Sequence, residues 1–192
     1  MATPITQKMG IQKELREALV EYGSVGIPVG AAAPVNAVAS TSTLTVDTQP
    51  TAGEVLTIGD VTYTFVANGT TPLTEGDIEL GALVADTQPE IVAAINGTDG
   101  HNVLNPAATA GAFAGDDSTL TATVAGVAGD NITATTDMTG GANAITAFAG
   151  GVDGTPGVVG AVVLDATRIY IAPAGNTISD ANWLRSAELT TY

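Results

Sequence analysis

The chain has 192 residues and a formal net charge of −15 at pH 7, and it is 45% hydrophobic but only 13% charged. So acidic a surface repels phosphate backbones and anionic lipids, and we therefore expect neither nucleic acid nor a membrane as a partner. The absence of cysteine excludes a disulfide framework and a thiolate metal site. The abundant small and β-branched residues favour short strands and tight turns over helices.

Residues 6–22 are predicted to form an amphipathic helix. Ile11, Leu15, Leu19 and Tyr22 recur at helical spacing, and charged residues occupy the other faces. A single helix cannot bury its own apolar stripe, so this one must dock on the chain's own core, on sister subunits or on another protein. We predict that these four side chains bind a partner.

Residues 23–40 follow as an extended linker, because their prolines and glycines break both helix and regular strand. Residues 1–40 are therefore predicted to form a helix with an extended anchoring arm. An arm of this kind suits attachment to a larger surface.

From residue 41 the hydrophobic pattern changes to a period of two. The alternation predicts a strand around Leu44 and then a hairpin over residues 55–65, with Gly59 and Asp60 at its bend. The segment 86–96 predicts one short helix with Pro89 in its first turn.

Residues 118–124 and 130–136 predict a second strand pair, joined by the turn AGVAG. The short helix then lies between two hairpins. These elements make up a predicted central β-rich domain, residues 41–150.

A Gly/Pro-rich hinge at residues 150–160 leads to two predicted strands, 161–164 and 168–171. Residues 151–192 are predicted to form a small C-terminal β module that contains Trp183, the only tryptophan. The expected fold class is mainly β (α+β), with an N-terminal helix and arm, a central β domain with one short helix, and this module.

The sequence offers little for catalysis. Its one histidine, His101, lies in a polar turn, where a solvated role is expected more often than a catalytic one. Ser24 lies in YGSVG, which lacks the first glycine of a nucleophile elbow. We predict that the protein is not an enzyme and uses no cofactor.

Three further motifs each fit a functional and a structural role. Glu75, Asp77 and Glu79 alternate and fit either a Ca²⁺ site or, preferably, a solvated acidic edge. Trp183 and Tyr170 fit either a carbohydrate contact or, preferably, the centre of a small module. Three segments match the N-glycosylation pattern and are interpreted as turn chemistry: Asn68-Gly69-Thr70, Asn96-Gly97-Thr98 and Asn131-Ile132-Thr133.

Two parts of the chain resemble structural proteins of tailed bacteriophages. The C-terminal strings, TPG from Thr155, RIYIA from Arg168 and NTISDANWLRSAELTTY from Asn176, resemble a small β module of head fibre and other virion surface proteins. The strings GEVLTIGDVTYTFV, IVAAIN and AGVAGDNITATT resemble a domain of phage head, tail and baseplate proteins. In the module, the resemblance implies that a Trp-and-Arg strand packs on a hairpin.

The resemblance implies a capsid decoration or cement protein on the outer surface of the virion, similar to head fibre proteins. It implies binding to the major capsid protein and self-association, with trimers favoured. The alternatives are a tail or baseplate subunit, and a glycan-binding adhesin module that exposes Trp183 or Tyr170 in a groove.

Overall fold

The computed structural model describes residues 33–158, 160–164, 168–175, 177–179 and 181–186. The helix predicted over residues 6–22 lies outside this part of the protein, as do the four side chains predicted to bind a partner, Ile11, Leu15, Leu19 and Tyr22. The described residues form three β-sheets and a single α-helix, which confirms the expectation of a mainly β fold. No helix among these residues is long and apolar enough to cross a membrane.

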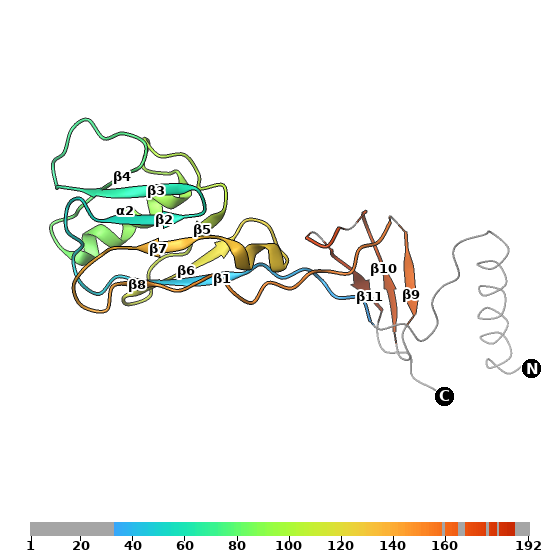
Figure 1. The fold of residues 1–192 in the computed structure, drawn as a ribbon. Coiled ribbons are helices and arrows are strands. Elements are labelled where there is room, and N and C mark those ends of the chain that lie inside the picture. Colours follow the sequence, from blue (N-terminus) through green and yellow to red (C-terminus); the bar gives the residue numbers. More distant parts are fainter. Residues whose placement is uncertain (1–32, 159, 165–167, 176, 180, 187–192) are drawn as a thin grey trace, which may run out of the picture.

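Two four-stranded sheets make up the central body, which we define as residues 41–149 (Figure 1). One sheet has the order β5-β6-β1-β8 and contains Ala108–Ala110, Asp117–Ala122, Thr41–Thr45 and Ala144–Ile145. The other has the order β4-β3-β2-β7 and contains Asp77–Glu79, Val61–Val66, Val55–Ile58 and Ala134–Thr136. A 3-10 helix, η1 at Val127–Asn131, lies between β6 and β7.

The predicted hairpin is confirmed. Strand β2 pairs with β3 and the register ends at Ile58 opposite Val61, which leaves Gly59 and Asp60 as a two-residue turn. Gly59 has a φ of +61°, a conformation that glycine adopts without steric cost at the first position of such turns.

Helix α2, Val84–Asn96, confirms the predicted short helix but begins two residues earlier. Pro89 therefore lies in the second turn, and the expectation that it occupies the first is wrong. Both Pro89 and Ala85 are exposed, so the carbonyl left without an N–H partner can reach water. The helix ends at Gly97, where φ is +62° and an added Cβ would lie 2.3 Å from the Leu104 nitrogen.

The predicted pairing of residues 118–124 with 130–136 is wrong. Strand β6 pairs with β1 and β5, whereas β7 pairs with β2 in the other sheet. The intervening turn and η1 lead from one sheet to the other. Nearness in sequence favoured a hairpin between these two segments, but β6 pairs instead with the preceding strand β5 and the distant β1, and β7 pairs with the distant β2.

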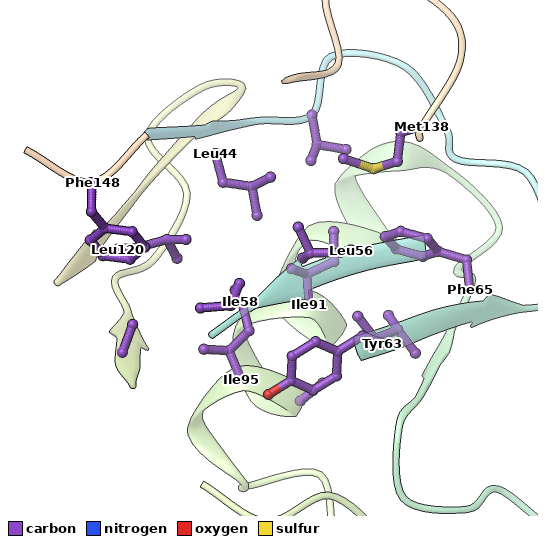
Figure 2. Close-up of a cluster of buried hydrophobic side chains, with 14 of the residues drawn as sticks. Leu44, Leu56, Ile58, Tyr63, Phe65, Ile91, Ile95, Leu120, Met138 and Phe148 are labelled. Atoms are coloured by element: carbon purple, nitrogen blue, oxygen red, sulfur yellow. The ribbon is translucent and has the colours of Figure 1, made fainter. Parts of the chain in front are cut away.

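Both sheets and α2 contribute to one hydrophobic core (Figure 2). Leu44 and Leu120 come from one sheet, Leu56 and Phe65 from the other, and Ile91 from the helix. All five side chains are completely buried. Burying apolar surface contributes about 25 cal/mol per Å² to the free energy of folding. This core is therefore the main source of stability of the central body.

The third sheet has the order β11-β10-β9 and is called the C-terminal sheet here: Leu184–Arg185, Ile169–Ile171 and Val162–Leu164. The two strands predicted in this region are confirmed as β9 and β10, which pair antiparallel, and Arg185 in β11 pairs with Tyr170. A second, smaller core lies against this sheet and consists of Tyr170, Ala172, Ala181 and Trp183.

Two extended segments join the central body to the C-terminal sheet, and we call them the neck: residues 33–40 and 150–157 (blue and orange in Figure 1). They run antiparallel, with Val38 opposite Val152. Two hydrogen bonds join Val35 to Thr155. The Val35 N–H donates to the Thr155 hydroxyl, and the Thr155 N–H donates to the Val35 carbonyl. The Asn36 side chain accepts the Trp183 backbone N–H at 2.8 Å. The boundaries after residues 40 and 150 stay predictions, but these bonds tie the arm to the C-terminal sheet.

Candidate interaction surface

The C-terminal sheet presents apolar side chains on its outer face. Ile171 and Leu184 lie directly opposite each other on β10 and β11 and are 45% and 58% exposed. Val162 pairs with Ile171 from the other side and is partly exposed. Because neighbouring residues alternate between faces, Tyr170 and Trp183 point into the core instead. We call Val162, Ile171 and Leu184 the outer row.

The neck has a second group of exposed apolar side chains. Val38 and Val152 form one cross-strand pair, and both are more than 40% exposed. Of the twelve large apolar side chains that are exposed in the described residues, seven belong to the neck, the C-terminal sheet or the segments around them: Val35, Val38, Val152, Val158, Ile171, Ile178 and Leu184. Concentrated exposure of this kind is typical of contact surfaces, whereas single exposed residues are ordinary.

Charge follows the opposite distribution. Residues 41–150 contain no lysine or arginine and thirteen of the twenty acidic residues: Asp47, Glu54, Asp60, Glu75, Asp77, Glu79, Asp86, Glu90, Asp99, Asp116, Asp117, Asp130 and Asp137. All five basic residues lie outside this range. The central body is therefore anionic and has five of the twelve exposed large apolar side chains, whereas the shorter neck and C-terminal region has seven.

The predicted Ca²⁺ ligands do not converge on one point. Asp77 accepts hydrogen bonds from the Thr74 backbone N–H and hydroxyl, both at 2.8 Å, and Glu79 accepts the Gly69 N–H at 2.6 Å. Glu75 is exposed. Among the described residues, no group of three or more His, Asp or Glu side chains is arranged to hold a metal ion. Strand β4 lies at the edge of its sheet, so the interpretation as an acidic edge fits.

An open depression of about 300 Å³ lies beside this edge. Its lining consists of Asn68, Glu79, Leu80, Gly81, Ala82, Asp86 and Glu90. Three of these residues are carboxylates, and none is aromatic or basic. Small-molecule pockets are generally lined mostly by hydrophobic and aromatic side chains, so this depression does not resemble one.

His101 is less exposed than the sequence suggested, because its side chain is held within the turn. Its Nε2 lies 3.1 Å from the Asp77 carbonyl oxygen and 3.4 Å from Asp99 Oδ2. Burial alone would raise the pKa of Asp99, but hydrogen bonds from Asn102 and His101 outweigh it and lower that pKa. Within the described residues, no serine or threonine hydroxyl forms a hydrogen bond with His101, and Ser24 lies outside those residues. This geometry gives the histidine a structural role in the turn.

Trp183 and Tyr170 are 7% and 8% exposed, and both belong to the small core. The Trp183 indole N–H donates to the Thr155 carbonyl oxygen at 2.7 Å. The adhesin alternative expects one of these rings in an exposed groove, and this expectation is not met. Stacking on a sugar would require the small core to open.

The base of the neck is tied to the central body through Asp130. Its Oδ1 accepts the Ser40 hydroxyl at 2.6 Å and the Gly151 backbone N–H at 2.9 Å. The Ser40 bond, followed by the Gly151 bond, lowers the pKa of Asp130. Because Ser40 is fully buried, this contact fixes where the arm leaves the central body.

We expect this contact to weaken in acid. A carboxylate with a lowered folded-state pKa stabilises the fold above its unfolded pKa, ~3.9, and loses that contribution as the pH falls through the folded value. When the pH is lowered below about 4, protection of the Gly151 amide from hydrogen exchange should therefore decrease. The reference is the amide of Ala149, whose N–H donates to the Thr41 carbonyl. An unchanged ratio of the two protection factors down to the acid limit of folding would contradict this role for Asp130.

Comparison with known proteins adds no assignment: no family model matches the chain, and no curated protein or solved structure matches it either. The sequence prediction placed partner binding on Ile11, Leu15, Leu19 and Tyr22, which lie outside the described residues and remain predictions. It missed the outer row. The alternation in RIYIA was the available signal, since it places Ile171 on the face opposite Tyr170.

Proposed function

We propose that this chain is a non-enzymatic decoration or cement protein of a tailed bacteriophage, which binds the outer surface of the major capsid protein shell. The observation that carries the proposal is the unequal distribution of charge and of exposed apolar side chains over the described residues. The neck and the C-terminal sheet expose apolar side chains, and the central body has thirteen acidic residues with no lysine or arginine. Such a protein is suited to attach at one end and to project a soluble, anionic body.

The mechanism is adhesion through shared contact area. Apolar surface buried between subunits joins neighbours, and several linked contacts make dissociation slow even when each is weak. In this proposal the apolar side chains of Ile11, Leu15, Leu19 and Tyr22 bind the shell or a sister subunit. The protein also self-associates, with a trimer favoured. The acidic body faces solvent, away from the packaged genome, whose phosphates it repels.

The arm contacts determine where a truncation should be made. Removing residues 1–40 would delete Asn36, which accepts the Trp183 N–H, and Ser40, which is bonded to Asp130. Removing residues 1–32 leaves both contacts in place and tests the anchor alone. A matched full-length variant replaces Ile11, Leu15, Leu19 and Tyr22 with serine.

We expect the unmodified protein to cosediment with purified heads of the phage that encodes it. The truncated and serine variants should bind about 100-fold more weakly, because they lose one of several linked contacts, while their urea midpoints stay unchanged. If the truncated protein decorates heads at full occupancy, the anchor assignment is wrong. If the unmodified protein binds tails or baseplates and leaves heads bare, the alternative of a tail or baseplate subunit replaces the proposal.

A further inference from the structure

The turn formed by residues 67–70 places an asparagine and a glycine at an exposed loop tip. Thr70 donates its N–H to the Ala67 carbonyl at 3.1 Å, and Gly69 has a φ of +80°. The Gly69 backbone N–H donates to Glu79 Oε1 at 2.6 Å. Asn68 itself is exposed, and its side chain forms no hydrogen bond with the described residues.

We propose that Asn68 is a self-modification site, which converts spontaneously to aspartate or isoaspartate with Glu79 as the proton acceptor. The Gly69 nitrogen attacks the carbonyl carbon of the Asn68 amide while Glu79 takes the proton from that nitrogen. A new N–C bond closes a five-membered succinimide ring, and the bond from this carbon to the amide nitrogen of Asn68 breaks. The amide nitrogen leaves as ammonia after it takes up the proton. One water molecule then opens either carbonyl of the ring, and no oxidant or reductant is needed.

The surroundings of Asn68 favour each part of this step. An ideal Cβ built on Gly69 meets nothing within 4 Å, so the attacking nitrogen is not crowded from that side. Asn68 and Glu79 both line the open depression, which gives water access to the ring. The Glu79 carboxylate already accepts a hydrogen bond from the Gly69 N–H, whose proton must be removed, so the base is in position before the reaction begins.

A matched site elsewhere in the protein holds the same pair of residues in a restrained setting. Asn96 is followed by Gly97, but the Asn96 amide donates to the Ala110 carbonyl and accepts the Ala110 N–H, both at 2.9 Å. The Gly97 N–H donates to the Ala94 carbonyl at the end of α2. Neither the Asn96 amide nor the attacking nitrogen is free to form the ring. The structure therefore distinguishes two sites that the sequence makes equivalent.

Conversion would add one negative charge beside Glu79, Asp86 and Glu90. The isoaspartate form would also insert a methylene group into the backbone of the loop between β3 and β4. Both products change the edge of the sheet while leaving the core in place.

The test is peptide mass mapping of the full-length protein after incubation at neutral pH. Cleavage after Glu54 and Glu75 releases residues 55–75, whose one asparagine is Asn68. Replacing NH₂ by OH raises the mass of this peptide by about 1 Da. We expect this product to accumulate at least about tenfold faster than the product at Asn96, which must wait for local opening. In denaturant the two rates should become similar.

Two variants separate the site from the base. N68Q should abolish the mass increase in residues 55–75, because the longer glutamine would have to form a larger, less favourable ring. E79Q should slow the reaction at Asn68 by about tenfold, less than a fully enclosed catalytic base contributes, and its urea midpoint checks the fold. Equal rates at Asn68 and Asn96 in the folded protein would overturn the site, and an unchanged rate in E79Q would overturn the role of Glu79.

Discussion

Replacing Trp183 with alanine is expected to unfold the C-terminal sheet while the central body stays folded. Among the described residues, the buried members of the small core are Tyr170, Ala172, Ala181 and Trp183, so the indole supplies much of the buried volume. Truncating a buried tryptophan costs about 3–5 kcal/mol, more than so small a core can lose. The change also leaves the Thr155 carbonyl without the indole donor.

Hydrogen exchange measures this effect locally. The Ala172 amide, which donates to the Ala161 carbonyl, should lose its protection in W183A. The Asn105 amide, which donates to the Ile95 carbonyl in the central body, should keep it. W183F keeps most of the ring volume but not the N–H donor, and it should cost only about 1 kcal/mol. Full protection at Ala172 in W183A would show that the arm, rather than the indole, holds the sheet.

Replacing Asn105 with alanine is expected to lower the free energy of unfolding of the central body by about 4 kcal/mol, since each buried group left unpaired costs about 1–3 kcal/mol. Asn105 is completely buried. Its amide donates to the Ile58 carbonyl and the Tyr63 hydroxyl, and its oxygen accepts the N–H groups of Ala107 and Ala108. This one residue therefore joins the β2–β3 hairpin to the segment that leads into β5.

Asn143 provides the matched control. Its oxygen accepts the N–H groups of Asp47 and Thr48, and its amide donates to the Thr48 carbonyl. These are the same kinds of bonds, but Asn143 is only partly buried, so water can replace them. N143A should cost about 1 kcal/mol in urea unfolding. Equal losses in the two variants would mean that burial does not decide the cost.

The sequence was most informative where a pattern is local. The alternation over residues 55–65 together with Gly59 predicted the β2–β3 hairpin, because a two-residue turn fixes the register of its own strands. The helix predicted over residues 86–96 is α2, and the apolar side chains of Ile91, Ala94 and Ile95, which recur at helical spacing in that segment, are buried. Strands β9 and β10 also lie within the two segments, 161–164 and 168–171, that were predicted to be strands.

The sequence by itself therefore determined the mainly β fold, the helix α2, the β2–β3 hairpin and the unequal distribution of charge. Tertiary structure alone decided that β6 and β7 belong to different sheets, that the arm pairs with residues 152–155, and that Trp183 is enclosed. It also decided that Asn68 is exposed while Asn96 is restrained. The physical reason is distance along the sequence. Periodicity shows which face of an element is apolar, whereas the partner of that face is chosen by packing among residues far apart in sequence.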